Sequence, residues 1–298
     1  MGRTWKNIKD IEKIRNYLLS IGGTEEEKRG DYEIFRIKIF NSHFIQYKNG
    51  TLYSTSSQNE KIFDIWKEID KIVGGRFISP TKDFLMGLDE TGKGEIIGPL
   101  ILVGVLFKKD LFNEIDYIIG SSDTKKRHDF EYWDNIFRKL KGLTGFFYYS
   151  IEIPPRRIDK DNINHLLDEG YTKIIKFLLR DLDSKRVRVV IDDYGVGDVL
   201  RRFLDTLDCE IIIEKNSEDK YLETRTASII SKRLREEKIK RIREDGRYII
   251  DGITIGSGNL DDKETLEWLR RWMQKEKKLP SFIRKSYIDI SKFYYLSR

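Results

Sequence analysis

Cysteine and histidine are scarce in this sequence of 298 residues, and their scarcity excludes several kinds of site. Cys209 is the only cysteine, so the chain has no intramolecular disulfide framework and no cysteine zinc site. The three histidines, His43, His128 and His165, are too scattered to indicate a histidine-rich metal site. No run reaches the roughly eighteen apolar residues that suggest a membrane span. We therefore expect a protein with no membrane partner.

Proline is also scarce, with five residues, whereas charged residues make up 36% of the chain and hydrophobic residues 39%. This composition resembles that of ion-pair-rich thermophilic proteins, although an AT-rich genome favours the same residues. The net charge of +6 fits a polyanionic partner but does not establish one. The first residues run into an amphipathic pattern and not into a signal peptide, so we expect a cytoplasmic protein.

The first 75 residues predict a small α+β domain. Apolar residues recur at helical spacing from Trp5 to Ile21 and again from Ile62 to Ile72, which predicts two helices. Between these two helices, residues 32–56 show the alternating pattern of β-strands. Lys48-Asn49-Gly50-Thr51 interrupts that pattern with a hairpin signal. Residues 76–82, which include Pro80, are the expected linker.

Residues 83–298 predict an α/β catalytic domain with a C-terminal helical extension. Strands are expected at 84–89, 98–107, 145–153, 187–192 and 210–215, and helices at 130–141, 161–181, 196–207 and 220–244. Three consecutive strands followed by strands that alternate with helices give a mixed sheet with helices on both faces. The segment Leu279–Ile290 gives no clear prediction.

The most informative motif is Gly87-Leu88-Asp89-Glu90-Thr91-Gly92-Lys93-Gly94, in which two acids end an apolar strand. Acids beside a hydrophobic core are costly unless something compensates their charge, and Mg²⁺ prefers such oxygen ligands. Adjacent residues on a strand point to opposite faces, so we expect Asp89 to be the central ligand. The alternative is a polar strand end with both acids in water.

The glycines favour a ligand site, because Gly92 and Gly94 allow a close backbone approach and their N–H groups could hold phosphate or hydroxyl oxygens. The run GLDETGKGEIIGPLILVGVLF resembles the opening motif of the ribonuclease HII and HIII families. The resemblance implies a ribonuclease H-like fold. It also implies that Gly92, Lys93 and Gly94 contact ribose 2′-hydroxyl groups, through which proteins distinguish RNA from DNA.

Three further segments match the same families in the same order. Asp123-Thr124-Lys125-Lys126 is similar to their Asp-Ser-Lys-Lys segment, which implies phosphate contacts by Thr124, Lys125 and Lys126, although a solvated basic loop would look the same. Asp192 ends an apolar strand and aligns with a family acid, whereas Asp193 should point away. Counting back from Ser228 places the fourth acid at Glu218, and Asp219 is its rival.

Features that separate the two families favour ribonuclease HIII. Glu218 and Asn162-Ile163-Asn164 resemble that family. Gly256-Ser257-Gly258 stands where ribonuclease HII has a Gly-Tyr segment with a nearby histidine, and neither the tyrosine nor the histidine is present. The N-terminal region resembles the TATA-binding-protein-like domain of ribonuclease HIII in position and size. The match is strong over residues 87–107 and 215–231 and weak over 1–75.

The resemblance implies an endonuclease that hydrolyses the RNA strand of RNA/DNA hybrids and leaves 5′-phosphate and 3′-hydroxyl ends. Two Mg²⁺ or Mn²⁺ ions, ~3.5–4 Å apart, would be held by Asp89, Glu90, Asp192 and Glu218, with Asp89 bridging them. The N-terminal domain of a monomeric enzyme would grip the hybrid. The alternatives are incision at single ribonucleotides in duplex DNA, as in ribonuclease HII, or a non-catalytic hybrid-binding protein.

Overall fold

The computed structural model describes residues 2–6, 8, 10–55, 59–73, 77–120, 122, 124–125 and 128–288. The chain forms two compact units. Unit 1 consists of Met1–Ser79 with Ile119–Asp123, and unit 2 consists of Pro80–Ile118 with Thr124–Arg298. No helix of the described residues is both long enough and apolar enough to cross a membrane.

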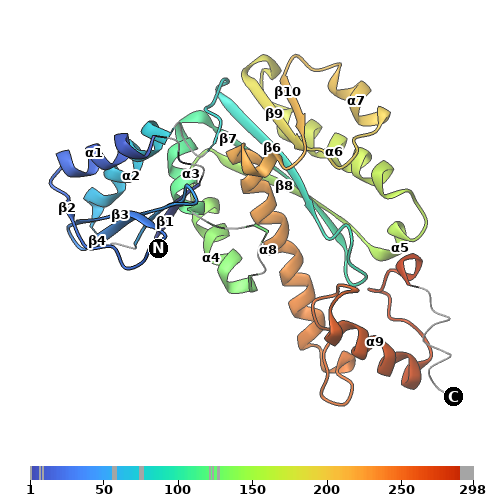
Figure 1. Ribbon diagram of the computed structural model, residues 1–298. Helices are drawn as coiled ribbons and strands as arrows, with labels where there is room; N and C mark the ends of the chain where they lie inside the picture. Colours follow the sequence, from blue (N-terminus) through green and yellow to red (C-terminus); the bar gives the residue numbers. More distant parts are fainter. Residues whose placement is uncertain are drawn as a thin grey trace. The chain divides into compact units, whose positions relative to one another are not determined.

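Unit 1 is an antiparallel five-stranded sheet with two helices, α1 (Ile11–Ser20) and α2 (Glu60–Val73) (Figure 1). Its strands lie in the order β1-β5-β4-β3-β2, with bounds β1 Arg3–Trp5, β2 Thr24–Glu25, β3 Glu33–Ile39, β4 Ser42–Tyr47 and β5 Leu52–Ser54. Alternate residues of β3 face the helices, and Phe35 and Ile37 are buried against Ile14 and Leu18 of α1. One apolar core therefore joins the sheet to both helices.

The hairpin at Lys48–Thr51 is confirmed, because Gly50 has a φ of 78° between paired strands β4 and β5. The predicted extension of the first helix back to Trp5 is wrong. Trp5 lies in β1, where it pairs with Leu52, and the helix begins at Ile11. Trp5 packs in the same apolar core as the residues of α1. Its position therefore continued the helical spacing of apolar residues seen in the sequence.

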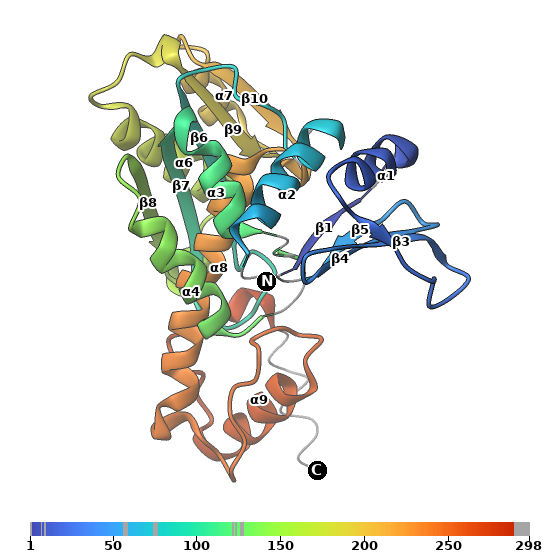
Figure 2. The ribbon, with the colours of Figure 1, turned by 90° about the vertical axis from the view of Figure 1, so that its left-hand side faces the viewer.

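Unit 2 contains a mixed five-stranded sheet in the order β10-β9-β6-β7-β8. Strands β6 (Phe84–Thr91), β7 (Leu100–Lys108) and β8 (Phe146–Ile153) are antiparallel, whereas β9 (Val187–Asp192) runs parallel to β6 and β10 (Glu210–Glu214) runs parallel to β9. Helix α6 (Ile163–Leu179) covers one face and α8 (Leu222–Glu244) the other (Figure 2). The predicted mixed sheet with helices on both faces is confirmed.

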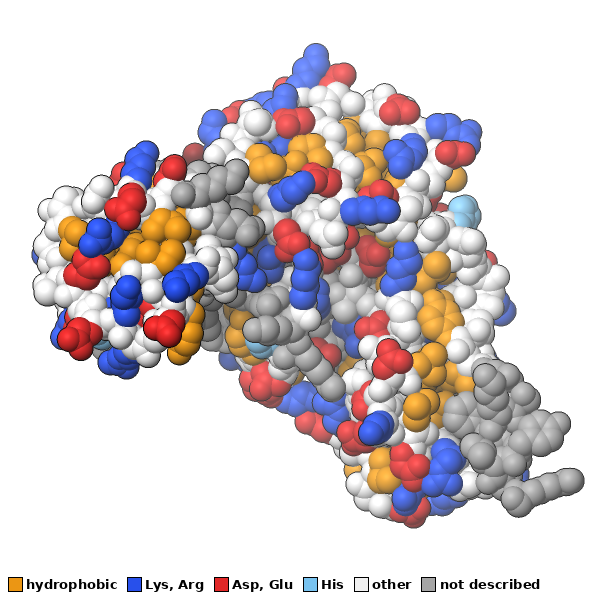
Figure 3. Space-filling model, in the orientation of Figure 1, with side chains coloured by type: hydrophobic (Ala, Val, Ile, Leu, Met, Phe, Trp, Pro, Cys, Tyr) orange, Lys and Arg blue, Asp and Glu red, His pale blue; other side chains and the backbone are white. Residues whose placement is uncertain are grey.

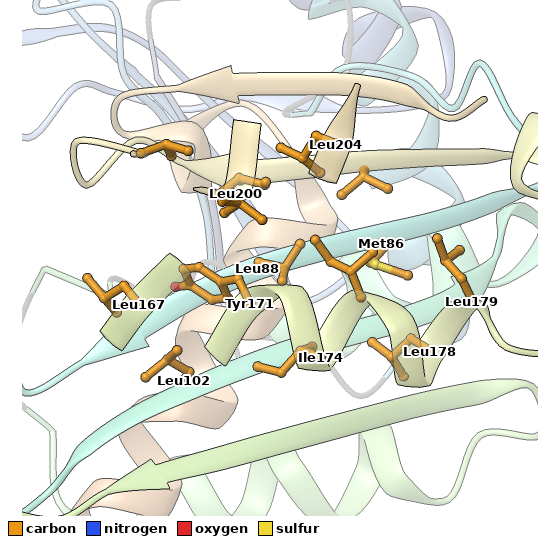
Figure 4. Packing of buried hydrophobic residues seen from close by; sticks show 14 of the residues in the cluster. Met86, Leu88, Leu102, Leu167, Tyr171, Ile174, Leu178, Leu179, Leu200 and Leu204 are labelled. Carbon is orange, nitrogen blue, oxygen red and sulfur yellow. The ribbon is translucent and has the colours of Figure 1, made fainter. Parts of the chain in front are cut away.

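The pleat of β6 assigns its residues to two faces. Met86 and Leu88 belong to the core under α6, together with Tyr171 of that helix (Figure 4). Gly87 lies on the other face, where an added Cβ would be 2.1 Å from the backbone of Glu223 in α8. Helix α8 can therefore approach the sheet closely because position 87 has no side chain.

The remaining helices of unit 2 are α3 (Phe112–Ile119), α4 (Phe130–Lys141), α5 (Pro155–Ile158), α7 (Asp198–Leu204) and α9 (Lys263–Glu276). Of these, α3 and α5 have no counterpart among the predicted helices. Helix α9 forms a separate apolar cluster with Ile97, Ile239 and Ile283. The segment after α9, for which no structure was predicted, is largely irregular and returns to the residues that follow β6.

Candidate active site

Asp89, Glu90, Asp192 and Glu218, here called the four acids, lie at the ends of three neighbouring strands. Asp89 and Glu90 are near the end of β6, Asp192 ends β9, and Glu218 lies in the short 3₁₀ helix η3 (Ser217–Asp219) after β10. Because β6, β9 and β10 are parallel neighbours, their carboxyl ends share one edge of the sheet. Functional groups of open α/β sheets gather at such an edge.

Asp89 points toward α8. It shares the pleat direction of Gly87, and only 8% of it is exposed. Burial raises the pKa of the Asp89 carboxyl well above its usual range, and the neighbouring Glu90 and Glu218 raise it further. The Lys232 ammonium on α8 lowers this pKa but does not offset the burial. In the free protein, Asp89 is therefore an acid whose negative charge is poorly compensated.

Glu90 points toward the opposite face. The hydroxyl of Tyr171, a fully buried residue of α6, donates to Glu90 Oε2 at 2.6 Å. Burial raises the pKa of Glu90, Asp192 raises it as well, and the Tyr171 hydrogen bond lowers it. Asp89 and Glu90 therefore point to opposite faces of β6, as predicted from the alternation of side chains along a strand.

Asp192 shares the α8 face of β9. Its Oδ1 accepts hydrogen bonds from the backbone N–H of Ser217 at 2.7 Å and from the Ser217 hydroxyl at 3.1 Å. Burial raises the pKa of Asp192 above its usual value, and Glu218 adds to the rise. Asp193 instead accepts from the N–H groups of Gly195 and Val196, so its side chain faces the following loop.

Glu218 and its rival Asp219 have different surroundings. Glu218 Oε2 accepts from the hydroxyls of Thr124 at 2.7 Å and Ser228 at 2.8 Å, and its charge acts on both Asp89 and Asp192. Asp219 forms ion pairs with Lys125 at 2.5 Å and Arg225 at 3.4 Å. The structure therefore brings Glu218, and not Asp219, together with the other three acids.

Gly92–Gly94, here called the glycine turn, follows β6 directly. Gly92 has a φ of 98°, a left-handed conformation that favours glycine. Gly94 is exposed, and a Cβ added there would meet no atom within 4 Å. Lys93 Nζ donates to the carbonyl of Tyr194 at 3.0 Å, and its charge lowers the pKa of Glu90. The turn thus offers open backbone at Gly94, in the segment that directly follows Asp89 and Glu90.

The segment of the predicted phosphate contacts has a mixed outcome. Thr124 is only 4% exposed, and its hydroxyl donates to Glu218 and accepts from Arg225 Nη1 at 3.0 Å. Lys125 is exposed. Lys126 lies outside the described residues. Thr124 is therefore placed to hold an acid, whereas the exposed Lys125 pairs with Asp219.

Comparison with known proteins shows the family. The sequence model described as Ribonuclease HII matches residues 86–290, which is more than half of the chain. The chain belongs to the ribonuclease HII family. It is 28% identical over 220 residues to ribonuclease HII of Sulfurisphaera tokodaii, an alignment that covers 72% of this chain and 99% of that protein. The ribonuclease HII of Methanosphaera stadtmanae is 30% identical over 216 residues, covering 69% of this chain and 92% of that protein.

Solved structures of the family share the fold. The ribonuclease H2 of Pyrococcus horikoshii matches with a TM-score of 0.58 and 24% identity, covering 72% of this chain and 98% of that one. The RNase H3 of Aquifex aeolicus matches with a TM-score of 0.51 and 24% identity, covering 96% of this chain and all of that one. Bst-RNase HIII in complex with Mn²⁺ matches with a TM-score of 0.61 and 13% identity, covering all of this chain and 99% of that one. The ribonuclease H-like fold class is confirmed.

The four acids of this ribonuclease HII family member fit a divalent cation by the chemistry of their donors. Buried carboxylates with raised pKa values need compensating positive charge, and hard cations take oxygen ligands. Among the described residues, no three histidine, cysteine or acidic side chains already stand as a metal-binding group. The pleat contributes to this, because it sends Asp89 and Glu90 to opposite faces of β6, while Tyr171 fixes one of the two oxygens of Glu90. Metal binding would require the acid side chains to turn toward a common point.

Several residues that contact the acids escaped the sequence analysis. Tyr171 falls at core spacing within the predicted helix 161–181, so its hydroxyl gave no separate signal. Arg225 holds the η3 segment, with its Nε donating to the carbonyl of Glu218 at 2.9 Å. Lys232 stands one helical turn after Ser228, the spacing that puts both side chains on one helix face, and its Nζ donates to Ser228 Oγ at 2.6 Å. The four-residue spacing of Ser228 and Lys232 could have predicted this contact from the sequence.

Proposed function

We propose that this protein is an endonuclease that hydrolyses the RNA strand of RNA/DNA hybrids with Mg²⁺ or Mn²⁺. The observation that carries the proposal is the meeting of the four acids at one sheet edge, where Glu90, Asp192 and Glu218 each raise the pKa of another of the four. Family membership supports a ribonuclease H activity. The Mn²⁺ complex of Bst-RNase HIII supports the choice of cofactor.

In the proposed mechanism, the four acids would hold two divalent ions: Asp89 would serve both, Glu90 and Glu218 would help to hold one, and Asp192 would help to hold the other. Two bound ions would activate a water molecule and stabilise the leaving 3′-oxygen, which gives 5′-phosphate and 3′-hydroxyl products. Ser217 orients Asp192 through two hydrogen bonds. Such partners orient the ligands of metal sites and tune their basicity.

The glycine turn is the proposed reader of the RNA strand, through ribose hydroxyl contacts of Gly92, Lys93 and Gly94. Lys125 and Lys126 would contact phosphates, so the affinity should fall as salt rises. We assign Thr124 an indirect part, since its hydroxyl is already used by Glu218. Residues 1–75 are the proposed substrate-binding domain, residues 76–82 its linker, and residues 83–298 the catalytic domain.

We further propose the ribonuclease HIII subtype, acting as a monomer. The alignments with the Aquifex aeolicus and Bst structures extend over 96% and 100% of this chain and so include the N-terminal unit. The alignment with Pyrococcus horikoshii ribonuclease H2 covers only 72%. The glutamate at position 218 supports the same subtype. The alternative, incision at single ribonucleotides in duplex DNA, is favoured by the names of the curated relatives.

Two substrates separate the subtypes. The protein is incubated with Mg²⁺ or Mn²⁺ and either a continuous RNA/DNA hybrid or a DNA duplex that contains one ribonucleotide. We expect faster cleavage of the hybrid, since a continuous RNA strand offers the glycine turn a ribose hydroxyl at every register. Faster cleavage of the single-ribonucleotide duplex would assign the ribonuclease HII activity instead, and cleavage of neither would refute the proposal.

A further inference from the structure

Residues Phe282–Tyr287, here called the C-terminal segment, run beside the chain that follows the glycine turn. Ile283 forms an antiparallel bridge with Ile97. The N–H of Gly98 donates to the carbonyl of Phe282 at 2.8 Å. The connection from the turn to β7 therefore pairs with a segment that lies about 190 residues later in the chain. These contacts satisfy backbone groups of the connection that belong to no regular element.

Two side chains of the C-terminal segment converge on one carbonyl of the glycine turn. Arg284 Nη1 and the Tyr287 hydroxyl both donate to the carbonyl oxygen of Lys93, at 3.3 and 3.0 Å. Arg284 Nε donates to the carbonyl of Gly98 at 3.1 Å, so one guanidinium joins both ends of this connection. The carbon of that guanidinium lies 5.4 Å from the ring centre of Tyr287. Both donors thus act together on the turn.

Hydrogen bonds that hold the Lys93 carbonyl also fix the direction of the Gly94 N–H. The carbonyl of Lys93 and the N–H of Gly94 belong to one planar trans peptide, so they point in opposite directions. Arg284 and Tyr287 lie on the carbonyl side, and the N–H of Gly94 therefore points away from them. Among the described residues no acceptor is found for this N–H, and Gly94 is exposed. The peptide presents a free donor of fixed direction.

The arrangement is costly for packing alone. Arg284 is fully buried, forms no ion pair with another described residue, and burial lowers the pKa of its guanidinium. A buried charge destabilises a fold unless partners compensate it, and an apolar side chain would fill the same space more cheaply. Arg235 of α8, which is 4% exposed, adds a further hydrogen bond to the carbonyl of Ile97 at 3.0 Å. Several charged donors are thus directed at this one connection.

We propose that Arg284 and Tyr287 are positioning residues that hold the Lys93–Gly94 peptide so that its N–H meets a ribose 2′-hydroxyl of the RNA strand. This inference rests on the proposed function and deepens it, because it assigns the C-terminal segment to substrate discrimination. Neither side chain touches the RNA in this account. They act by orienting one peptide. Because that peptide binds the substrate equally in the ground state and the transition state, its orientation affects KM and not kcat.

The test compares Tyr287→Phe with Tyr248→Phe, whose ring packs in the same C-terminal cluster against Trp272 and Phe282. A hydrogen bond of this kind changes an equilibrium by about 2- to 10-fold. For hydrolysis of a hybrid, Tyr287→Phe should raise KM by about that factor and leave kcat within about twofold. In EDTA, where no cleavage occurs, the preference for hybrid over DNA duplex should fall by the same factor. Tyr248→Phe should change neither.

A second variant, Arg284→Lys, keeps the charge and removes the fork that reaches two carbonyls, so its KM should rise more than that of Tyr287→Phe. An unchanged KM and an unchanged hybrid preference in Tyr287→Phe would overturn the inference. A fall in kcat with an unchanged KM would also overturn it. If the wild-type protein itself does not prefer hybrid over DNA duplex, the proposed function fails first, and this inference fails with it.

Discussion

Asp89 and Glu90 adjoin in the chain, but the pleat of β6 directs their side chains to different helices. Asp89 meets the Lys232 side of α8, whereas Glu90 is held by Tyr171 of α6. Each acid is therefore tuned by its own surroundings. Because Asp89 and Glu90 are adjacent in the chain, both lie at the same sheet edge. Their different partners determine how each carboxylate is oriented there.

Replacing Tyr171 with phenylalanine should weaken Mn²⁺ binding. The hydroxyl fixes one oxygen of Glu90, and loss of such a partner typically lowers metal affinity by about 10- to 100-fold. Electron paramagnetic resonance of free Mn²⁺ over metal-stripped protein measures the affinity. Tyr194→Phe is the control, because its hydroxyl donates to Asp168 at 2.7 Å and not to one of the four acids. Equal affinities for the wild type and Tyr171→Phe would contradict this role.

Replacing Asp89 with asparagine should stabilise the metal-free protein at neutral pH. Burial raises the pKa of Asp89, so the folded state holds this proton more tightly than the unfolded state. The resulting stability is present below the ordinary aspartate pKa and is lost as pH rises through the raised pKa. Asp89→Asn avoids that loss, and we expect a gain on the order of 1–3 kcal/mol at pH 7. Urea unfolding in EDTA at several pH values measures it; a gain already present at pH 3 would contradict the cause.

The fourth acid can be identified by two neutral substitutions. Glu218→Gln should lower the hydrolysis rate by about 100-fold or more, since loss of a ligand exceeds the usual effect of losing a ligand's partner. Asp219→Asn removes ion pairs of a half-exposed side chain, so its rate should stay within about threefold of the wild type. Initial rates on a hybrid at saturating Mn²⁺ decide the matter, and the reverse ranking would transfer the role to Asp219.

At this scale the sequence supplied the acids but not their partners. Asp89, Glu90 and Asp192 could be found because each lies at the end of an apolar strand. Tyr171 could not be found, since a buried tyrosine at core spacing in a helix looks the same whether or not its hydroxyl contacts an acid. Which carboxylate oxygen accepts a hydrogen bond depends on contacts between residues far apart in the chain.

Helix α8 depends on the glycine at position 87. A Cβ there would be 2.1 Å from the Glu223 carbonyl carbon and 2.4 Å from the Thr224 nitrogen, both backbone atoms that cannot move independently. Gly87→Ala should therefore destabilise the protein by about 3 kcal/mol or more. Gly246→Ala, where no atom lies within 4 Å, should change stability by less than about 0.5 kcal/mol. Thermal unfolding compares the two, and similar midpoints would contradict the close approach.

Elements were predictable where one pattern ran without interruption. The strand Val187–Asp192 and the helix Phe130–Lys141 have the predicted bounds. Helices α3 and α5 were not predicted, and two further features were assigned wrongly. Strand β1 was taken for helix because Trp5 sits at helical spacing from residues of the same core, and the turn at Phe40, with a φ of 52°, carries no glycine to mark it. Such features arise from packing between distant segments.

At the scale of the whole molecule, the chain divides its proposed tasks between two units. The face in Figure 3 shows basic and acidic side chains interspersed, which fits a composition with nearly balanced charge. On that face, the excess of positive charge is not gathered into one continuous field. Tight binding of a polyanion should then need several separate contacts, including contacts made by unit 1.

Removing residues 1–79 should weaken hybrid binding by about 10-fold or more, since a second binding unit raises overall affinity without new chemistry. The single-turnover cleavage rate at saturating protein should change by less than about threefold. The alignment that covers 99% of the Sulfurisphaera tokodaii enzyme uses only 72% of this chain, so relatives exist without such a unit. Fluorescence anisotropy and quenched-flow cleavage separate the two constants. An unchanged affinity would contradict the substrate-binding role.

The central claim, that the four acids form one metal-dependent ribonuclease site, is tested most directly by cleavage of a labelled RNA/DNA hybrid. The wild-type protein should cut the RNA strand only when Mg²⁺ or Mn²⁺ is present and should leave 5′-phosphate ends. Asp89→Asn should abolish this cleavage while the protein stays folded. Cleavage that persists in EDTA, or that survives Asp89→Asn, would contradict the account.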